Sequence, residues 1–539
     1  ASLKEGQFVE TGGYYTKGDA GQAKYLIVAA QAADGYGDHT LANGTVAVLQ
    51  VDGEVNVLQF GATGLASTTT DKPAIQASID YIEGQFQTGV EGSGAGQIYL
   101  PKGNYRVKNL RVSDRVTIKG DGRGTVLLPE LTSGSGDFVV IFDCPDPDAI
   151  LADFNGGMGL QSLMIRGDLS SRFYNADARQ LTNGVKLTNL FHGYFRDVSI
   201  ECFRGFGMFI TDNVRETDFY SLFIGGCGDD GVTSGLSPKD ALHITSTGSA
   251  EDSVNNLNFY SHANITQYYR ALYINDQAAT KNEVRRIRFK NSIFHPDLDG
   301  TVPPPNSSLI ELGSCQDVTF DDCVITAFGR DTTNHYGIKI DGNGNGQAVY
   351  VKIVGGYIGG FNPANTGTGG SGLFIGDASQ VSVIGGTRIT DNKYNTIVRD
   401  GTTSNFGIVT IDSSTRIADL SSELYGGIVT VNSPVSFNIE QNSRPIRVVS
   451  GVDTIDVKDS SIRCINGTSY TVTLPDVSLL WIGKKISITK ANSSNTITVA
   501  TNGLEQIDFA STKALATTNR GFEVEWDGAQ WSTINSLTI

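Results

Sequence analysis

A strand-like pattern that recurs about every thirty residues is the feature that most restricts the fold of this 539-residue chain. The pattern is an apolar residue, an outward-facing residue and a second apolar residue, as in Leu257-Asn258-Phe259. Between residues 257 and 381 it recurs at steps of 30, 31, 33 and 30 residues. A fixed period of this length predicts a solenoid, in which each coil of the chain stacks on the coil before it.

A second series of the same pattern interleaves with the first, so each coil contains at least two strands. Its members are Val185–Leu187, Met208–Ile210, Leu242–Ile244, Leu272–Ile274, Ile310–Leu312, Ile338–Ile340 and Leu373–Ile375. The 64 glycines, an excess over ordinary composition, supply the many turns that such coils need. A β-propeller needs a period of about 40–50 residues and a leucine-rich repeat needs a ladder of leucines, so the pattern predicts a parallel β-helix.

The two ends of the chain follow other patterns. Residues 1–59 contain short apolar segments separated by Gly and Asp, and we expect a small β head there. A helix should follow, with Asp71 as its cap, Pro73 in its first turn and Gly84 at its end. Residues 60–430 form the predicted β-helix, whereas the longer β-branched strands of residues 431–539 predict a separate C-terminal β-sandwich.

The charge of the chain argues against two classes of partner. It carries 41 Lys and Arg against 57 Asp and Glu, and the net charge of −16 repels nucleic-acid phosphates and anionic lipid head groups. It has no run of about 18 apolar residues and no secretory signal, so we expect neither nucleic acid nor a membrane as a partner. The six cysteines lack a C-x-x-C spacing, and we expect buried free thiols rather than disulfides or zinc ligands.

Four segments near the start of the predicted β-helix carry a resemblance: Phe60–Gly64, Asp71, Ala74–Gln76 and Tyr99–Tyr105. They resemble the beginning of the pectate-lyase-like right-handed β-helix superfamily. Together with the coil series and the terminal β module, the chain resembles the bacteriophage tailspike depolymerases along nearly all of its length. The segments Glu10–Tyr15 and Gly21–Tyr25 are similar to the part of those tailspikes that precedes the β-helix.

The resemblance implies a homotrimer that binds and cleaves bacterial surface polysaccharide. It places the protein in the virion tail, outside the host cell after assembly in the bacterial cytoplasm. It also implies attachment to the phage tail or baseplate through an N-terminal domain, which we expect to precede Ala1 because the sequence lacks an initiator Met. For the C-terminal β-sandwich it implies trimerisation or glycan contact.

Outward residues on successive coils should form rows, because equivalent positions lie about 4.8 Å apart. The second series predicts a row of Lys186, Phe209, His243, Tyr273, Glu311, Lys339 and Phe374. The first series predicts a row of Tyr220, Asn258, Arg288, Thr319 and Lys352. Such rows combine aromatic faces for sugar rings with charged groups. The segments 245–256 and 275–286 are the longest of those that join a strand of the second series to the next strand of the first. Long loops carry function more often than short ones, so we expect a functional site beside them.

Hydrolysis of a glycosidic bond needs a protonated carboxylic acid and a second carboxylate. The two lie about 5–5.5 Å apart in retaining enzymes and about 6.5–9.5 Å apart in inverting ones. Neighbouring or alternate coils can supply both distances. Our candidate catalytic residues are Glu251, Asp252, Asp276, Glu311 and His243. The four acids would share the acid and base roles, and His243 would orient or transfer a proton; each could instead be an ordinary surface group.

The candidate substrate-binding residues are Phe209, Tyr220, Tyr273, Arg285, Arg286 and Arg288. The three arginines and Lys290 form the densest basic run in an acidic chain, which suits uronic or nonulosonic acids. The same run could instead be a solvated strand edge.

Three functions remain open at this stage, and a polysaccharide hydrolase is favoured. A lyase would need a uronic acid substrate, a base such as His243 or Tyr273, and a cation such as Arg288. A spike that binds glycan without cutting it is the third. An esterase is not indicated, because the chain has no G-x-S-x-G elbow.

Some further motifs carry less information. Gly228–Gly231 resembles an element of the polygalacturonases, but the rest of that family's pattern is missing and a turn is the simpler interpretation. Asp297–Gly300 has parts of a calcium loop but lacks its twelfth-position acid, since residue 308 is Ser. We therefore expect no metal and no other cofactor. Trp526 and Trp531 could stack on sugars or pack inside the C-terminal sandwich.

Overall fold

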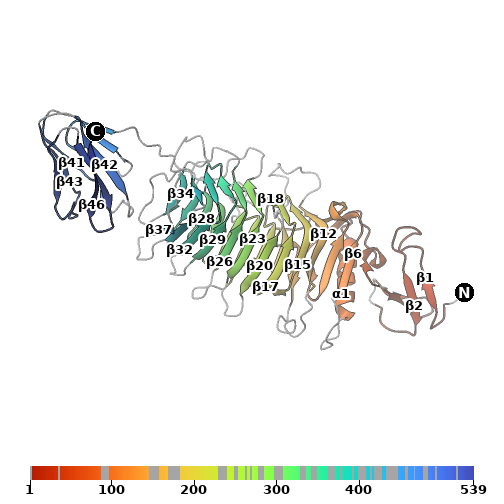
Figure 1. The fold of residues 1–539 in the computed structure, drawn as a ribbon. Helices are drawn as coiled ribbons and strands as arrows, with labels where there is room; N and C mark the ends of the chain where they lie inside the picture. Colours follow the sequence, from red (N-terminus) through yellow and green to blue (C-terminus); the bar gives the residue numbers. More distant parts are fainter. Residues whose placement is uncertain are drawn as a thin grey trace.

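The computed structural model describes residues 3–33, 37–51, 53–85, 96–144, 157–167, 182–228, 239–247, 253–260, 264–267, 270–276, 284–296, 308–327, 336–341, 349–361, 371–376, 379–390, 394–398, 408–412, 415–417, 428–432, 447–455, 459, 461–465, 468–477, 484–491, 495–517 and 520–538. They form a right-handed parallel β-helix, which follows a small N-terminal sheet and precedes a C-terminal two-sheet module (Figure 1). The fold class predicted from the repeat is therefore confirmed.

Each regular coil contains three strands, one in each of three rows. The first row contains β5 (Val55–Asn56), β6 (Gly96–Leu100), β9 (Val116–Gly120), β12 (Gly159–Arg166), β15 (Tyr194–Glu201), β17 (Val214–Tyr220), β20 (Val254–Tyr260), β23 (Val284–Lys290), β26 (Gln316–Asp321), β29 (Val349–Val354), β32 (Ser379–Ile384), β35 (Ile408–Asp412) and β37 (Ile428–Asn432). The short β14 (Leu190–Phe191) pairs with the beginning of β17.

The second row contains β7 (Gly103–Val107), β10 (Thr125–Pro129), β18 (Phe223–Cys227), β21 (Asn264–Gln267), β24 (Ile293–Pro296), β27 (Val324–Thr326), β30 (Tyr357–Gly359), β33 (Arg388–Thr390) and β36 (Arg416–Ile417). The later halves of β12 and β15 also lie in this row. The two series of sequence patterns did not separate it from the first row, although they allowed for more than two strands in each coil.

The third row is a separate ten-stranded sheet. It contains β8 (Leu110–Val112), β11 (Phe138–Asp143), β13 (Asn183–Thr188), β16 (Met208–Thr211), β19 (Leu242–Ser246), β22 (Leu272–Asp276), β25 (Ser308–Leu312), β28 (Tyr336–Ile340), β31 (Ser371–Ile375) and β34 (Tyr394–Val398). Its register agrees with the predicted outward row at every step from Lys186 to Phe374. We call the outward side of this sheet the His243 face.

The register of the first row differs from the prediction at its beginning. Asn258 pairs with Asp218, and Tyr220 pairs with Tyr260, two residues further along. The remaining steps, Asn258 to Arg288, Thr319 and Lys352, are as predicted. We call the outward side of the first row the Tyr220 face.

Inward side chains fill the β-helix with a continuous apolar core. Its largest element is a ladder of phenylalanines inside the first row, with neighbouring ring centroids 4.3 to 5.4 Å apart; the members are Phe195, Phe219, Phe259, Phe289 and Phe320. All five rings are fully buried. Fully buried aromatic side chains contribute large apolar areas, so this ladder ties five successive coils together.

The turn between the first and second rows needs a left-handed residue. Ser221, Asn291, Asp322, Gly355 and Gly385 occupy equivalent places there, with φ between 50° and 69°. Asn, Asp and Gly tolerate this conformation better than other residues. The chain therefore bends sharply at this corner of each coil.

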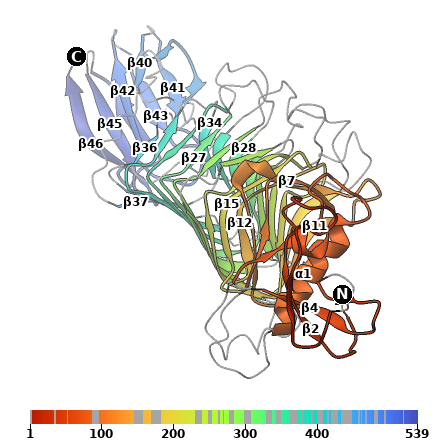
Figure 2. The ribbon, with the colours of Figure 1, turned by 90° about the vertical axis from the view of Figure 1, so that its right-hand side faces the viewer.

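Helix α1 (Asp71–Gln85) lies against the first coils of the β-helix (Figure 2). Its Ala74, Ile75 and Ile79 are buried in the shared apolar core. The predicted helix is present, but Asp71 does not act as a side-chain cap. Its carboxylate accepts hydrogen bonds from the backbone and hydroxyl of Thr63, both at 2.9 Å, and so fixes the preceding loop. The short η1 (Val57–Phe60) comes before that loop.

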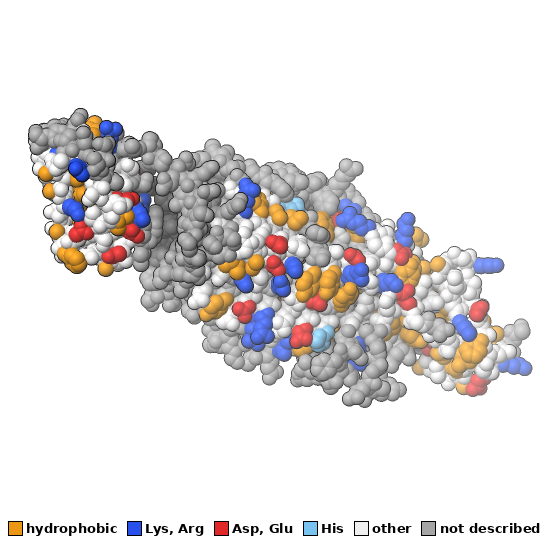
Figure 3. Space-filling model, viewed as in Figure 1, with side chains coloured by type: hydrophobic (Ala, Val, Ile, Leu, Met, Phe, Trp, Pro, Cys, Tyr) orange, Lys and Arg blue, Asp and Glu red, His pale blue; other side chains and the backbone are white. Residues whose placement is uncertain are grey.

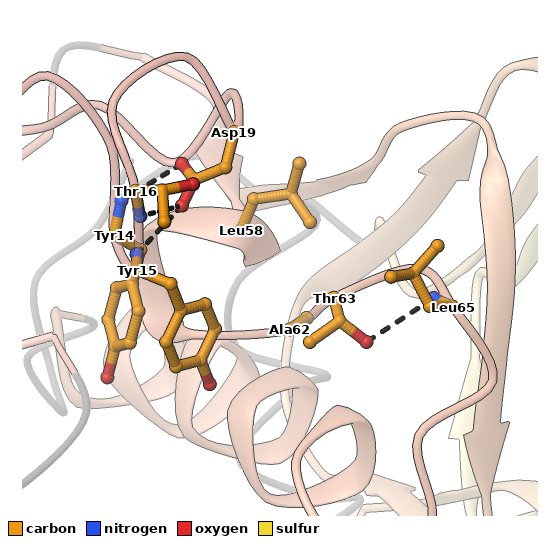
Figure 4. Close-up of a pocket in the computed structure, with 8 residues that line it drawn as sticks. All are labelled: Tyr14, Tyr15, Thr16, Asp19, Leu58, Ala62, Thr63 and Leu65. Carbon is orange, nitrogen blue, oxygen red and sulfur yellow. Dashed lines mark hydrogen bonds between the residues drawn. The ribbon is translucent and has the colours of Figure 1, made fainter.

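The N-terminal sheet contains β1 (Phe8–Glu10), β2 (Lys24–Val28), β3 (His39–Thr40) and β4 (Val46–Gln50), all antiparallel. Beside it, the Asp19 carboxylate accepts backbone N–H bonds from Tyr14, Tyr15 and Thr16 (Figure 4). It also accepts one from Gly21. These bonds, led by the one from Thr16, lower the pKa of Asp19 to about 2. The turn lines a small pocket of about 200 Å³ against Thr63 and Leu65.

The C-terminal module packs two sheets around its own core. One contains β38 (Arg447–Val449), β40 (Ser461–Cys464), β42 (Lys485–Lys490), β45 (Arg520–Trp526) and β46 (Trp531–Thr538). The other contains β39 (Asp453–Thr454), β41 (Tyr470–Thr473), β43 (Ile497–Ala500) and β44 (Thr512–Leu515). Strands β38 to β43 alternate between the sheets in parallel pairs, so the sandwich begins as a second short solenoid.

Trp526 and Trp531 are buried in this core, with ring centroids 5.8 Å apart. They pack the sandwich and do not present their faces to solvent. The six cysteines are free and buried, as the sequence indicates. Residues 229, 230 and 297–300, which carry the polygalacturonase-like and calcium-loop motifs, lie outside the described residues. No helix among the described residues is long and apolar enough to cross a membrane.

Candidate functional site

The His243 face carries a strip of aromatic rings over successive coils. His243 lies between Phe209, at 5.1 Å, and Tyr273, at 4.9 Å between ring centroids. Phe206 stacks on Phe209 at 4.9 Å and meets the edge of His243 at 4.9 Å. Neighbouring rings are inclined to one another by 26° to 62°, so the strip presents a row of aromatic faces and edges against which sugar rings can pack.

A buried carboxylate holds the imidazole of His243 in place. Asp240 Oδ2 lies 2.6 Å from His243 Nδ1, and only 1% of the Asp240 side chain is exposed. This contact fixes the ring orientation and leaves Nε2 as the nitrogen available for proton exchange. The same arrangement, a carboxylate that orients a histidine, recurs in many acid–base sites.

Arg270 joins Asp240 to Glu311 across the next coils. Its Nε donates to Asp240 Oδ1 and its Nη1 donates to Glu311 Oε2, both at 2.6 Å. Its guanidinium also lies 3.9 Å from the ring centre of Tyr273. One mostly buried arginine therefore connects the His243 dyad, the Tyr273 ring and the Glu311 carboxylate.

The Glu311 carboxylate is held by several further donors. The Ser308 hydroxyl donates to Glu311 Oε2 at 3.2 Å, and Lys339 Nζ lies 3.8 Å from Oε1. Lys339 also lies 3.6 Å from Asp341 Oδ2. Since both carboxylates lie close to one ammonium group, their nearest oxygens are less than about 8 Å apart, which is within the range of glycosidase acid pairs.

The network controls the charges of its members. Burial would raise the pKa of Asp240, but Arg270 and His243 outweigh it, and the pKa lies below its usual value. Burial acts to lower the pKa of Arg270, yet Asp240 and Glu311 raise it overall. Burial raises the pKa of the Tyr273 hydroxyl, Arg270 opposes this, and Glu311 adds to it. At neutral pH the site therefore contains an ionised Asp240, a charged Arg270 and a neutral Tyr273.

The structure brings together four of the sequence-predicted site residues: Phe209, His243, Tyr273 and Glu311. Asp276 is at the end of β22 but is only 1% exposed, and the coil pairing places Tyr273, not Asp276, opposite Glu311. The expectation of an exposed Asp276 carboxylate beside Glu311 is therefore wrong. Glu251 and Asp252 lie outside the described residues.

The other predicted substrate-binding residues lie on the Tyr220 face. Tyr220 stacks between Tyr260, at 5.2 Å, and Tyr194, at 5.5 Å. Arg288 forms an exposed ion pair with Asp321, and Arg285 and Arg286 are exposed on the same strand. Figure 3 shows apolar, acidic and basic side chains interspersed along the middle of the β-helix. The predicted substrate-binding residues come from both rows, and the two rows belong to two different sheets.

Asp240, Arg270 and Asp341 are site residues that the sequence candidates do not include. Asp240 and Arg270 lie three positions before an outward row residue, in the equivalent segments Asp240-Ala241-Leu242-His243-Ile244 and Arg270-Ala271-Leu272-Tyr273-Ile274. The thirty-residue spacing places one directly above the other, and Ser308 has the same place before Glu311. This recurrence at the period of the coil, and not the alternation within a strand, is the signal that could have located Asp240 and Arg270. Among the described residues, no group of three or more His, Cys, Asp or Glu could hold a metal ion.

Comparison with known proteins supports the fold. The sequence matches no protein-family model and no curated protein. The enzymatically active domain of tailspike protein 2 from bacteriophage CBA120 is 12% identical, with a TM-score of 0.53 over 80% of this chain and 60% of that one. The full-length tailspike protein 2, from an Escherichia coli O157:H7 bacteriophage, is 13% identical, with a TM-score of 0.53 over 80% of this chain and 53% of that one.

A tailspike from an Acinetobacter phage is 12% identical, with a TM-score of 0.49 over 100% of this chain and 92% of that one. The chain spans little more than half the length of tailspike protein 2, at 60% of its active domain and 53% of the full protein. It shares with that protein the parallel β-helix fold of phage tailspikes, as the sequence resemblance predicts.

Proposed function

We propose that this protein is a phage tailspike that binds and depolymerises bacterial capsular or O-antigen polysaccharide by hydrolysis of glycosidic bonds. The observation that supports this most is the His243 face, where an aromatic strip leads to a charged, partly buried cluster around Glu311. The strip suits sugar rings and the cluster suits acid–base chemistry. The fold shared with phage tailspikes supports the same proposal.

In this proposal Glu311 is the carboxylate that attacks the sugar or activates water. Its hydrogen bonds to Arg270 and Ser308 fix the direction of its oxygens. Asp341 is the second acid of the pair and is assigned the proton transfer to the leaving oxygen, because Lys339 lies close to both acids and so brings them near each other. His243 and Tyr273 position the sugar between the aromatic strip and the acids.

The test is mass spectrometry of products formed from purified capsular and O-antigen polysaccharides. Hydrolysis adds one water to each excised fragment. We expect Glu311→Gln and Asp341→Asn each to abolish cleavage while polymer binding persists. Exposed Asp317→Asn, on the first row, is the matched control and should retain full activity. Full activity in both Glu311→Gln and Asp341→Asn would contradict the assignment.

A polysaccharide lyase is the second candidate, and the Asp240–His243 contact is the observation that favours it. A histidine oriented by a buried carboxylate could remove the proton beside a uronic acid carboxylate, and neutral Tyr273 could protonate the leaving oxygen. The products would then carry an unsaturated end and no added water. In that case His243→Asn, rather than Asp341→Asn, should abolish cleavage.

We also propose that the protein assembles as a homotrimer and is carried on the virion tail. The support is the resemblance to tailspikes, which implies a homotrimer. We propose that attachment to the tail lies on the N-terminal side of the β-helix and that residues 431–539 contribute to trimer closure. Light scattering on the purified chain should give the mass of three copies; a monomer mass would contradict this part of the proposal.

A further inference from the structure

A wide pocket of about 750 Å³ opens at the N-terminal end of the His243 face. Helix α1 forms one of its walls, with Lys72 and Gln76 among the lining residues. Strands β8, β11 and β13 of the ten-stranded sheet form the other wall, with Arg111, Phe138 and Lys186. Nothing in the proposed reaction uses this pocket, although it lies on the same sheet.

Three cationic side chains in the pocket have no ionic partner. The charged ends of Lys72, Arg111 and Lys186 form no ion pair with any residue that the structure describes. Arg111 is exposed, and Lys72 and Lys186 are partly buried. The same cavity is also lined by three acidic side chains, Asp80, Glu83 and Asp143, so what distinguishes the three cations is that none of them is paired with a described carboxylate.

The acidic side chains that line the same pocket are already engaged. Glu83 accepts hydrogen bonds from Ser113 N at 2.6 Å, from Ser113 Oγ at 2.7 Å and from Asp114 N at 3.0 Å. Burial raises the pKa of Glu83 in spite of these bonds. Asp143 accepts a hydrogen bond from Asn189 at 3.0 Å, and Asp80 accepts one from Gln76 at 2.9 Å. These donors are neutral, so the carboxylates are oriented by other groups and are not paired with Lys72, Arg111 or Lys186.

The pocket is continuous with the aromatic strip. The ring of Phe138 lies 6.3 Å from that of Phe209, which is next to His243. Arg111, Ile141, Lys186, Phe209 and His243 pair in that order on successive strands of one sheet. With a strand spacing of about 4.8 Å, Lys186 is about 10 Å and Arg111 about 19 Å from His243 along the β-helix.

We propose that this pocket binds a sugar carboxylate of the polysaccharide, several sugars away from the bond that is cleaved. The inference rests on the proposed function, because it assumes that a glycan lies along the His243 face. Charge-assisted bonds from a guanidinium and two ammonium groups would recognise the carboxylate of a uronic or similar acidic sugar. The substrate class is therefore an anionic polysaccharide, and recognition of its charge is separated in space from the reaction.

The experiment uses the full chain and one polysaccharide that it cuts, before and after reduction of the polymer's carboxylates to alcohols. The variant is Arg111→Gln with Lys186→Gln, and the matched control is Lys352→Gln, an unpaired exposed lysine of the first row. On the native polymer, we expect the double variant to raise KM at least about tenfold with kcat nearly unchanged. On the reduced polymer, wild type and double variant should have equal KM values. On the native polymer, 0.5 M NaCl should remove most of the difference in KM between wild type and double variant, because salt screens the charges.

Two results would overturn the inference: a KM of the double variant equal to that of Lys352→Gln, or efficient cleavage of neutral polysaccharides only. Failure of the proposed function gives a different result, since wild type would then cut no polymer. In that case, direct binding of the acidic polymer to wild type and to both variants tests the pocket independently. Weaker binding by the double variant alone supports the subsite, and equal binding by all three proteins contradicts it. Thermal unfolding confirms that each variant is folded.

Discussion

The His243 face and the Tyr220 face are built from the same coils, yet they use charge in opposite ways. On the His243 face, Asp240 is 1% exposed and Arg270 is 12% exposed, and the contacts extend over several coils. On the Tyr220 face, Arg288 is 45% exposed, and its contact with Asp321 joins only two neighbouring coils. Both faces also carry stacked aromatic rings.

This difference distinguishes a reaction site from an ordinary surface better than composition does. Taking ions out of water is costly, so a buried charge network is kept only where its geometry is needed or where every member is paired. Exposed ion pairs are common and contribute little. The aromatic rows alone would not separate the two faces, because tyrosines and phenylalanines stack on both.

The largest expected effect comes from Asp240→Asn. The amide keeps the shape, but it leaves Arg270 with one carboxylate and removes the charged group that orients His243. We expect cleavage to fall about 100-fold or more and the free energy of unfolding to fall by about 3 kcal/mol. Rate assays and urea denaturation measure the two effects. The matched Asp321→Asn should change both only slightly, and an equal loss in the two variants would remove the distinction between the faces.

A smaller effect is expected from removing one ring on each face. Phe209→Ala should weaken polysaccharide binding about tenfold, because a sugar loses its stacking surface next to His243. Tyr260→Ala on the Tyr220 face should leave binding unchanged. Calorimetric titration in a Glu311→Gln background measures binding without cleavage. If Tyr260→Ala weakens binding and Phe209→Ala does not, the glycan lies on the other face.

The pH dependence of the free energy of unfolding tests the buried charges of the His243 face separately. The pKa of Asp240 is lowered in the folded protein, so its ion pairs stabilise the fold fully above the ordinary Asp pKa of about 3.9. That stabilisation is lost as the pH falls through the lower, folded-state value. The stability difference between wild type and Asp240→Asn should therefore shrink as the pH falls below about 4. A difference that grew between about pH 4 and about pH 2 would contradict the lowered pKa.

The smallest effect is expected for Arg288→Gln. The exposed pair with Asp321 should contribute less than about 0.5 kcal/mol to the free energy of unfolding, and less still in 0.5 M NaCl. Cleavage should remain at the wild-type rate. A tenfold loss of activity would restore Arg288 as a substrate-binding residue, as the basic run in the sequence suggested.

The sequence predicts the third row well because its apolar positions alternate without a break. The sequence prediction of the first row is wrong at Tyr220, and the cause is a single buried polar residue. The buried Thr217 occupies the place that Leu257 has on the next coil. Because Thr is not counted as apolar, the pattern slipped by two residues and Tyr220 was placed opposite Asn258 rather than Tyr260.

The second row was not recognised because its strands are short and give little alternation. Its signal lies in the preceding turn, where Asn291, Asp322 and Gly355 recur about one coil apart. The sequence predicts Phe209, His243, Tyr273 and Glu311 of the site but not Asp240 and Arg270, for a related reason. Outward positions in a strand follow from alternation, whereas Asp240 and Arg270 lie just before their strands, where alternation says nothing about direction.

Because the ten-stranded sheet is parallel and in register, outward residues on successive coils are separated by a constant distance, one strand spacing. A coil contacts mainly the coils on either side of it, so a whole coil could be gained or lost without altering the others. Each such event would move the pocket that contains Arg111 and Lys186 toward or away from Glu311 by one strand spacing. Under the proposed function, whole-coil insertion and deletion would thus adapt the protein to a new spacing of charges along a glycan, with no change to the residues proposed to cut it.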